Sequence, residues 1–468
     1  MDAKERMNIP RQFSRELPVA GRIKNFDEVV SGYSAEVAQL EADRCLQCKK
    51  PKCREGCPVH NDIPGFIKLL REGKIEEAYW LDRQTNSLPA ICSRVCPHEF
   101  QCEGHCIRGK KGEPVAIGML ERYIVDWMVA NNKNLLQACA LPKDKKVAIV
   151  GSGPAGMSVA YYLAHLGYHC TIFESLPVSG GMLAVGIPAY RLPRPIIEAE
   201  FEALRNCGVT MVNNVTIGKD KSLQDLKNEG FAAVFLGPGA HASRKLGVEG
   251  EDLAGVLHGV DYLRRVNVGE QLNLGRNVVV VGGGNVAIDC ARTALRTGSD
   301  QVFILYRRTK AEMPAAQAEI HHLEEEGVRI EMLAAPVKIH GENGRLTKIE
   351  CLRMKLGECD ASGRCRPEVV EGSNFMIEAD AIIPAISQDV DPTAGSGLDF
   401  TMTRWGTYVV DELTMQTSVD WVFAAGDAVL GPQTVAKAVF QAKEAAESIR
   451  RYLEGADLKA GREVAPAE

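Results

Sequence analysis

Eight of the fifteen cysteines lie between Cys45 and Cys106. They form two groups, Cys45-x2-Cys48-x4-Cys53-x3-Cys57-Pro58 and Cys92-x3-Cys96-Pro97-x4-Cys102-x3-Cys106. Short spacers between thiolates, with proline directly after two of them, are typical of [4Fe-4S] ligands. Structural zinc sites use paired Cys-x2-Cys knuckles, and only Cys45 and Cys48 form such a pair. The spacing therefore favours two iron–sulfur clusters over zinc, and ligands could be exchanged between the two groups, as in ferredoxins.

Composition and charge restrict the setting in which these cysteines act. The chain has 468 residues and a formal net charge of −6, so we expect about three folding units and no nucleic-acid-binding surface. No apolar run reaches the ~18–20 residues of a membrane span, and the polar N-terminus has no apolar core of a secretory signal. We therefore expect a cytoplasmic protein without membrane or nucleic-acid partners, in which disulfides are rare.

The remaining cysteines are expected to be ordinary apolar or surface residues. They are Cys139, Cys170, Cys207, Cys290, Cys351, Cys359 and Cys365. Cys359 and Cys365 could form a pair, because both lie in the polar, turn-rich segment 355–373, which predicts a hairpin loop.

A dinucleotide-binding motif follows the apolar run 147–150. Its residues are Gly151-Ser152-Gly153-Pro154-Ala155-Gly156. Such glycines permit a tight turn, a close approach of the backbone to a pyrophosphate, and close packing of helix on strand. The next predicted strand ends in Glu174, which could accept a hydrogen bond from a ribose hydroxyl. A strand, a glycine turn, a helix and an acid in this order strongly predict a site for FAD or a related dinucleotide.

A second motif of the same kind begins after the β-branched run 277–281. It reads Gly282-Gly283-Gly284-Asn285-Val286-Ala287, and its next strand ends in Arg307-Arg308 instead of an acid. Two guanidinium groups at this place could bind a 2′-phosphate through paired donors. The pattern favours NADP(H) over NAD(H), although a pair of solvated arginines is the alternative.

A third nucleotide element lies near the C-terminus, where an apolar strand ends in Gly426-Asp427 and is followed by Thr434 and Val435 at the start of a helix. The acid could accept a hydrogen bond from the ribityl chain of a flavin. We therefore predict an α/β protein with an N-terminal α-helical iron–sulfur domain (1–140) and two interleaved Rossmann-like domains. The FAD-binding domain comprises 141–250 and 390–468, and the NADPH-binding domain, inserted in it, comprises 251–389.

Together these motifs resemble a known family over nearly the whole chain. The cysteine groups, GSGPAG, SGGMLAVGIPAYRLP (179–193), GGGNVAIDCARTALR (282–296), YRRTKAEMPA (306–315) and VFAAGDAVLGPQTV (422–435) are similar to those of the NADPH-dependent glutamate synthase small-subunit family. The same family includes homotetrameric glutamate synthases, the N-terminal half of dihydropyrimidine dehydrogenase, and the large subunit of an electron-bifurcating NADH-dependent reduced ferredoxin:NADP oxidoreductase. The resemblance implies further flavin contacts from Gly181, Met182, Gly186 and Arg191.

The resemblance also implies how the cluster ligands are divided. One cluster would be bound by Cys45, Cys48, Cys53 and Cys106, and the other by Cys57, Cys96, Cys102 and a non-cysteine ligand, which we assign to Glu121. The alternative is that Glu121 is a residue on the surface of a helix and binds no cluster. We expect Cys92 to pack near the clusters without acting as a ligand. Pro238, between Gly237 and Gly239, departs from the small or hydroxyl residue usual in the family and is expected to shift that turn.

The expected activity is electron transfer between NADPH, FAD and two [4Fe-4S] clusters. Cofactors carry this chemistry, so we assign no catalytic acid or base. We expect His321 and His322 to be solvated. The resemblance implies a large FMN-containing partner that makes glutamate from glutamine and 2-oxoglutarate. A smaller flavoprotein or ferredoxin partner is the bifurcating alternative, and a homo-oligomer is possible. A scaffold with inactive nucleotide sites is a third reading, which the intact glycines, Glu174 and the arginine pair argue against.

Overall fold

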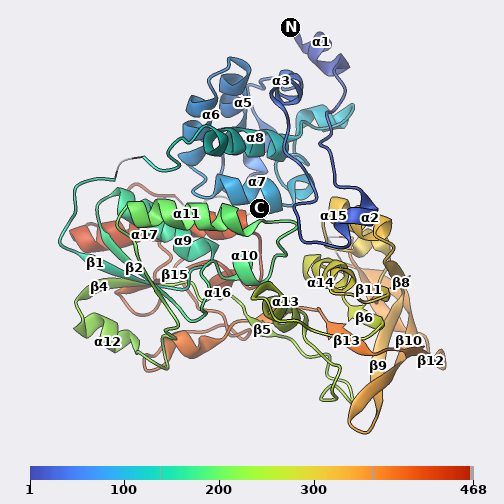
Figure 1. Ribbon diagram of the computed structural model, residues 1–468. Coiled ribbons are helices and arrows are strands. Elements are labelled where there is room, and N and C mark those ends of the chain that lie inside the picture. The colour runs from blue at the N-terminus through green and yellow to red at the C-terminus, as the bar shows by residue number, and fades with distance from the viewer. Residues whose placement is uncertain (138, 361–362, 464–468) are drawn as a thin grey trace.

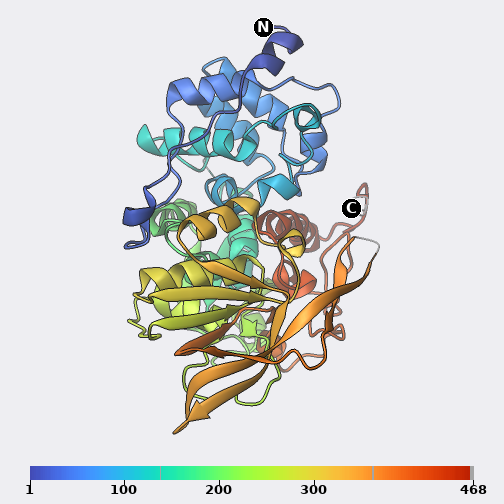
Figure 2. The ribbon, with the colours of Figure 1, turned by 90° about the vertical axis from the view of Figure 1, so that its right-hand side faces the viewer.

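The structure is a computed structural model that describes residues 1–137, 139–360 and 363–463. Figure 1 shows a helical unit at the top and two sheet-containing units side by side beneath it. Figure 2, from the side, shows the same helical unit stacked on the sheet-containing part of the molecule. The predicted combination of a helical domain with two interleaved nucleotide-binding domains is confirmed.

The helical unit is built from short helices around one apolar core. Its α-helices are α1 (Ala3–Asn8), α3 (Ala35–Asp43), α4 (Lys52–Glu55), α5 (Ile63–Arg71), α6 (Ile75–Arg83), α7 (Pro89–Val95) and α8 (Ile117–Ala130). The short helix α2 (Val19–Arg22) lies apart from this unit (Figure 1). In α5, Ile63, Phe66, Ile67 and Leu70 are buried at helical spacing, as expected for an amphipathic helix. The Asp62 carboxylate caps this helix by accepting a hydrogen bond from the backbone N–H of Gly65 over 3.3 Å. The segments that carry the eight clustered cysteines pack against these helices.

The first α/β unit contains a parallel five-stranded sheet in the order β15-β4-β1-β2-β3. Its strands are β1 (Lys146–Val150), β2 (His169–Glu174), β3 (Thr210–Asn213), β4 (Phe231–Leu236) and β15 (Val422–Ala424), and its helices are α9 (Pro154–His165), α10 (Met182–Val185), α11 (Arg194–Asn206), α12 (Leu223–Asn228), α16 (Asp427–Leu430) and α17 (Val435–Glu454). Four of the five β1 residues are buried, because helices cover both faces of a parallel sheet. In Figure 1, α9, α11 and α17 lie between the sheet and the helical unit.

The second α/β unit is inserted between β4 and β15 of the first. Its parallel sheet has the order β13-β6-β7-β8. The elements of this unit are α13 (Gly259–Asn267), β6 (Asn277–Val281), α14 (Asn285–Arg296), β7 (Gln301–Tyr306), α15 (Gln317–Glu325), β8 (Arg329–Met332) and β13 (Ala381–Pro384). Where the chain crosses between the units, β5 (Ala242–Ser243) pairs with β14 (Gln388–Asp389) in antiparallel fashion. The predicted domain limits stay predictions, and residues 464–468 of the last range lie outside the described residues.

An antiparallel sheet extends the second unit. It consists of β9 (Ala334–Glu342), β10 (Arg345–Cys359), β11 (Cys365–Val369) and β12 (Phe375–Glu378). Cys359 and Cys365 are opposite each other where β10 and β11 meet. The hairpin predicted for segment 355–373 is therefore present, with residues 361 and 362 outside the described part.

Two disulfides connect four of the cysteines that we expected to be isolated. Cys139 is bonded to Cys207, and Cys359 is bonded to Cys365. The expectation was wrong for Cys139 and Cys207, because the segment after the helical unit returns to the end of α11, which no sequence spacing indicates. All eight clustered cysteines are free thiols.

The N-terminal segment contacts the inserted unit through a buried cluster of charges. Figure 1 shows α2 beside α15. The Arg22 side chain, 2% exposed, lies 3.0 Å from Glu326 and 2.8 Å from Glu325. His322 lies 3.0 Å from Glu16 and is buried, whereas His321 is exposed. The expectation that His322 is solvated was therefore wrong, because the N-terminal segment covers that face of α15.

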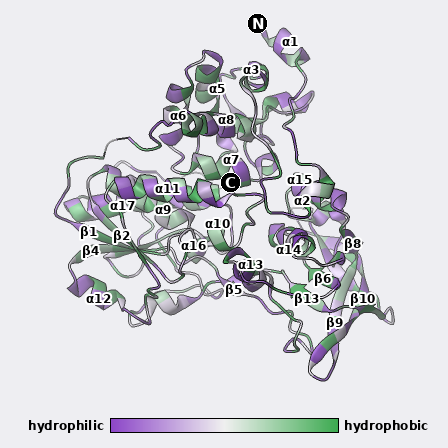
Figure 3. Ribbon diagram, viewed as in Figure 1, coloured by the Kyte–Doolittle hydropathy of each residue, from purple (hydrophilic) through white to green (hydrophobic). Residues whose placement is uncertain are grey.

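Apolar residues occupy the strands at the centres of both sheets, and polar residues cover outer faces such as α12 (Figure 3). Among the helices of the described residues, none is both long and apolar enough to cross a membrane.

Candidate electron-transfer site

The first glycine loop has the geometry of a phosphate-binding turn. Gly151 has a φ of +95°, and a Cβ there would lie 2.3 Å from the carbonyl oxygen of Gly237. A Cβ on Gly156 would lie 2.0 Å from the carbonyl oxygen of Gly151. Both positions therefore require glycine. A Cβ on Gly153 would meet no atom within 4 Å, so that face of the loop is open to a ligand.

Glu174 is placed where the sequence predicted, at the carboxyl end of β2 and beside the glycine loop. Its carboxylate accepts hydrogen bonds from the backbone N–H of Ser152 over 3.0 Å and of Leu176 over 2.9 Å. The side chain also lines the cavity described next. Glu174 thus holds the loop in shape while facing the ligand space.

One cavity of about 1190 Å³ extends across both α/β units. Nearly all the predicted cofactor-binding residues line it: Gly151, Gly153, Pro154, Ala155, Glu174, Gly181, Met182, Gly186, Arg191, Gly283, Gly284, Asn285, Val286, Arg307, Arg308, Gly426, Asp427, Thr434 and Val435. Gly156 stands behind the loop. The structure therefore brings the three sequence motifs together around a space of the size that dinucleotides need.

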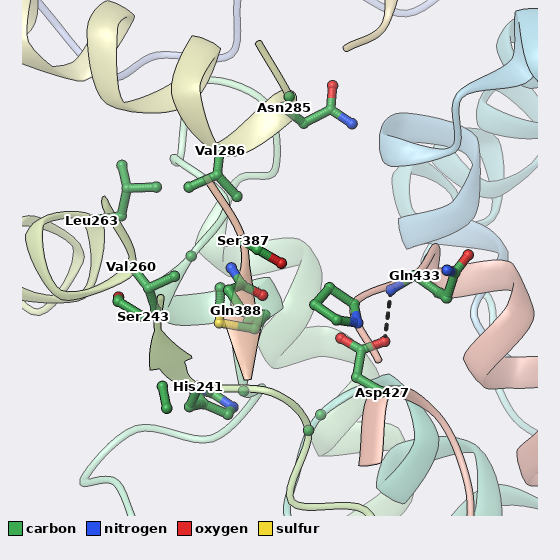
Figure 4. Close-up of a pocket in the computed structure, with 18 of the residues that line it drawn as sticks. His241, Ser243, Val260, Leu263, Asn285, Val286, Ser387, Gln388, Asp427 and Gln433 are labelled. Atoms are coloured by element: carbon green, nitrogen blue, oxygen red, sulfur yellow. Dashed lines mark hydrogen bonds between the residues drawn. The ribbon is translucent and has the colours of Figure 1, made fainter. Parts of the chain in front are cut away.

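Figure 4 shows the carboxylate of Asp427 in this cavity, opposite Val286 and Asn285 of the inserted unit. The Asp427 carboxylate accepts a hydrogen bond from the backbone N–H of Gln433 over 3.0 Å. Burial raises the pKa of Asp427 to about 6. Thr434 caps α17 by accepting from the backbone N–H of Lys437, so the positive end of that helix dipole points toward the cavity.

Arg191 lines the cavity but has acidic partners of its own. Its guanidinium lies 2.8 Å from Asp289 and 3.2 Å from Glu319. Both acids belong to the inserted unit, on α14 and α15. Arg191 thus connects the two α/β units at the cavity, a role that its position in the sequence did not indicate.

The arginines after β7 face the same cavity, and in the part of the chain that the structure describes neither forms an ion pair with a carboxylate. Burial lowers the pKa of Arg307, and the nearby positive charges of Arg308 and Arg364 lower it further. Arg308 donates a hydrogen bond through Nε to the carbonyl oxygen of Cys365 over 2.7 Å. A region of positive charge at this place suits an anionic group.

Several lining residues were missed by sequence reasoning as site residues. Gly237, Pro238, Gly239 and His241 lie between β4 and β5, and Pro97 comes from the helical unit. The departure at Pro238 thus lies directly at the cavity. Only the Gly-Pro-Gly sequence could have indicated the first group, and no local signal could have indicated Pro97.

The first set of thiols lies around a small hollow in the helical unit. Cys45, Cys48, Cys53 and Cys106 all line it. Burial raises the pKa of the Cys53 thiol to about 12, and the proximity of Cys106 and Cys45 raises it further. The structure thus places Cys106 with the first sequence group, in the combination that the resemblance implies.

The second set lies between the helical unit and the first α/β unit. Burial raises the pKa of the Cys57 thiol, which also lies near Glu121 and Cys96. Cys102 lies near Cys57, Cys96 and Glu121. Cys102 and Glu121 are buried, and Cys57 and Cys96 are partly buried. Three free thiols and one carboxyl group gathered in this way fit a cluster site.

Glu121 is buried rather than on a helix surface. Its Oε1 accepts a hydrogen bond from Nδ2 of Asn86 over 2.8 Å. Burial raises the pKa of Glu121, and the nearby Asp82 carboxyl raises it further. Cys92 is also buried and lies against Cys96, so it lies in the same part of the structure as the second thiol set.

One of the two thiol sets lies closer to the nucleotide cavity than the other. Val95 and Pro97, on either side of Cys96, line the cavity. Gln101, next to Cys102, donates a hydrogen bond to Thr434 over 3.2 Å. The first set instead lies around its own hollow, where Cys48, Cys53 and Cys106 are partly exposed. The second set is thus adjacent to the nucleotide cavity and the first set lies nearer the surface.

Comparisons with known proteins agree with this arrangement. Residues 22–133 match the family described as dihydropyrimidine dehydrogenase domain II, 4Fe-4S cluster, and residues 145–442 match pyridine nucleotide-disulphide oxidoreductase. The chain is 42% identical to the NADPH-Fe(3+) oxidoreductase subunit beta of Geobacter sulfurreducens, over 94% of this chain and 69% of that protein. It is 37% identical to the glutamate synthase [NADPH] small chain of Azospirillum brasilense, over 93% of both chains.

Among solved structures, FprA from Mycobacterium tuberculosis in complex with NADPH has the same fold. Its TM-score is 0.58 at 19% identity, over 69% of this chain and 88% of that chain. The sequence, the fold and the site thus describe an NADPH-linked oxidoreductase that uses FAD and [4Fe-4S] clusters, and the chain belongs to the family of the small chain of NADPH-dependent glutamate synthase.

Proposed function

We propose that this chain is the electron-input subunit of a larger complex of the glutamate synthase type. In this proposal it takes electrons from NADPH and delivers them to a large FMN-containing partner that makes glutamate from glutamine and 2-oxoglutarate. The observation that carries the proposal is the order of the sites. Val95 and Pro97, which flank Cys96, line the nucleotide cavity, whereas the Cys45 set surrounds a separate hollow of the helical unit.

The residues of the cavity support the first step by positioning. The Gly151 loop and the start of α9 would hold the pyrophosphate of FAD, Glu174 its ribose, and Asp427 its ribityl chain. The Gly283 loop would hold NADPH, with its 2′-phosphate at Arg307 and Arg308. When bound, the flavin accepts electrons in pairs and releases them singly, which the clusters can then carry. Arg191, paired with Asp289 and Glu319, keeps the two units in register around the cavity.

The assigned cluster ligands follow the two thiol sets. We propose that Cys45, Cys48, Cys53 and Cys106 bind the outer cluster, and that Cys57, Cys96, Cys102 and Glu121 bind the inner one. A carboxylate ligand is harder than a thiolate and would change the potential of the inner cluster. Thiolate clusters require reducing conditions, and for this reason we propose a cytoplasmic location.

The surface around the outer set would receive the partner. Lys49, Lys50, Arg54, Lys110 and Lys111 are exposed on the segments that flank Cys48, Cys53 and Cys106. Within the described ranges, these five side chains have no ion pair with a carboxylate. A partner with an acidic surface at its electron-accepting site would fit here, and its association would weaken as ionic strength rises.

The extent of the match favours the small-chain proposal over another relative. The chain covers 93% of the Azospirillum small chain but 69% of the Geobacter subunit. The alternative, the large subunit of an electron-bifurcating ferredoxin:NADP oxidoreductase, has no comparable observation in its favour.

An anaerobic pull-down of the tagged chain from its host tests the proposal. We expect a large subunit that carries FMN, in amounts that fall when the wash contains high salt. A smaller subunit with FAD and a [2Fe-2S] cluster would replace the proposal with electron bifurcation. Recovery of this chain alone would show a stand-alone homo-oligomer instead.

A further inference from the structure

Three arginine side chains meet at one end of the nucleotide cavity. Arg307 and Arg308 follow β7, and Arg364 comes from the turn between β10 and β11. All three line the cavity. Arg307 lies close enough to Arg308 and Arg364 for both to lower its pKa. Like charges gathered at one end of a cavity repel each other unless an anion lies between them.

No carboxylate is among the groups that act on the pKa of Arg307, whereas the charges of Arg308 and Arg364 both lower it. Glu312 follows Arg308 by four residues; the charge of Arg308 helps to lower the pKa of this carboxyl, but the hydrogen bonds of Glu312 are made to Thr309. The Glu312 carboxylate accepts hydrogen bonds from the backbone N–H of Thr309 over 2.9 Å and from the Thr309 hydroxyl over 2.6 Å. Arg191, by contrast, is matched by two acids within the same cavity. The three arginines therefore leave an excess of positive charge at the β7 end of the cavity, which an anionic ligand would balance.

The backbone of Arg364 is fixed at this position by several contacts. The N–H of Arg364 donates to Oδ1 of Asp360 over 3.1 Å, and the N–H of Asp360 donates to the carbonyl oxygen of Arg364 over 3.0 Å. Arg308 donates to the carbonyl oxygen of the next residue, Cys365, over 2.7 Å. Because the backbone of Arg364 is held by these contacts, less ordering of this residue is needed on binding.

We propose that Arg364 is a third residue that binds the 2′-phosphate of NADP(H), contributed by the β10–β11 hairpin. This inference rests on the proposed function, in which Arg307 and Arg308 bind the same group. It adds a specificity-determining residue that is separated by more than fifty residues from the glycine motif it serves, and it gives the hairpin a role in choosing NADP(H) over NAD(H).

The test compares three variants of the holoenzyme: Arg364→Ala, Arg307→Ala and Arg366→Ala. Arg366 is the matched control, because it is an exposed arginine of the same hairpin and is not among the residues that line the cavity. Dissociation constants for 2′,5′-ADP and 5′-AMP are measured by calorimetry, since the two ligands differ by the phosphate alone. Arg364→Lys, which keeps the charge, is measured in the same way.

We expect Arg364→Ala to weaken 2′,5′-ADP binding about fivefold to tenfold, as for loss of one partly exposed charge-assisted contact, and to change 5′-AMP binding little. Arg364→Lys should recover part of the loss, and Arg366→Ala should behave as the wild type. If Arg307→Ala loses the preference for 2′,5′-ADP while Arg364→Ala keeps it, the role of Arg364 is overturned and the proposed site stands. If both variants keep the preference, the proposed phosphate site itself is wrong.

Discussion

Gln101 of the helical unit donates a hydrogen bond from Nε2 to Oγ1 of Thr434, at the start of α17, over 3.2 Å. Gln101 precedes Cys102, and Thr434 lines the nucleotide cavity. The contact brings Cys102 close to the end of the cavity at which we propose that the flavin binds. Electron transfer from a flavin to a cluster requires such proximity, and this geometry is the basis of the order of sites proposed above.

The division of the ligands predicts which cysteine substitutions act alike. Cys106→Ser should alter the same cluster signal in electron paramagnetic resonance as Cys45→Ser, because both thiols line one hollow. Cys102→Ser should alter the other signal. Cys92→Ser is the matched control, since Cys92 is buried in the inner set but is not assigned as a ligand, and both signals should remain. If Cys106→Ser and Cys102→Ser affected the same signal, the division would be wrong.

Glu121→Ala should perturb the inner cluster and spare the outer one. The carboxyl group is buried beside Cys96 and Asn86, and the nearby Asp82 carboxyl also raises its pKa. The measurement is again the paramagnetic resonance spectrum of the reduced protein, with Glu36→Ala on the exposed face of α3 as control. An unaltered spectrum in Glu121→Ala would remove Glu121 from the ligands.

Arg307→Ala should reduce the preference for NADPH over NADH about tenfold to one-hundredfold, since hydrogen bonds to charged groups contribute about 1.5–3 kcal/mol. The steady-state ratio of kcat/KM for the two cofactors, with an artificial electron acceptor, measures this effect. Arg276→Ala provides the control, because Arg276 precedes β6 of the same unit but is largely exposed at 82%. Equal losses with both cofactors would show that Arg307 does not recognise the 2′-phosphate.

Asp427 should make the flavin-free protein less stable as pH rises. Its pKa is about 6 in the folded protein and about 4 when unfolded. A raised pKa means that the folded protein favours the protonated Asp427 carboxyl. The contribution of this protonated group to the free energy of unfolding is therefore complete below pH ~4 and is lost as pH rises through ~6. Asp427→Asn should abolish this dependence and be more stable than the wild type by about 2 kcal/mol at pH 7.

Thermal unfolding of the flavin-free wild type and Asp427→Asn at several pH values between 4 and 7 measures the difference. A melting temperature difference that stays constant over this range would contradict the assigned pKa. Flavin binding should also weaken in Asp427→Asn if the carboxylate accepts a hydrogen bond from the ribityl chain.

Arg22→Ala should destabilise the contact between the N-terminal segment and the inserted unit by about 2 kcal/mol. The Arg22 side chain is buried against Glu325 and Glu326, although Arg292 and Arg296 still neutralise Glu326 in the variant. This remaining pairing places the loss below the 3–5 kcal/mol typical of a fully broken buried pair. Thermal unfolding measures this loss of stability, with Arg15→Ala at an exposed position as the control. Equal melting temperatures for Arg22→Ala and the wild type would contradict the prediction.

Local patterns predicted the parts of the site that one stretch of chain forms by itself. The loops at Gly151 and Gly283, and the strand ends at Glu174 and Arg307, are set by turn geometry and by the alternation of strand and helix. The grouping of Cys106 with Cys45 followed only from the family resemblance. The spacing indicated only that ligands could be exchanged between the two groups, not which cysteine is exchanged.

Other features depend on segments that are far apart in the sequence. His322 was expected to be solvated because its neighbours are acidic, yet the N-terminal segment covers it and places Glu16 3.0 Å away. Arg191 was expected only at the flavin, and its pairing with Asp289 depends on the insertion of the second unit. Such contacts become visible only when the elements are packed together.

The most direct test of the account follows the path of electrons after rapid anaerobic mixing of the protein with NADPH. Flavin absorbance and cluster paramagnetic resonance signals are recorded from milliseconds onward, in the wild type and in Cys96→Ser. The account predicts that flavin bleaching precedes the appearance of the cluster signals, and that Cys96→Ser keeps the bleaching but delays or loses reduction of the outer cluster. Outer-cluster reduction at the wild-type rate in Cys96→Ser would contradict the proposed order of sites.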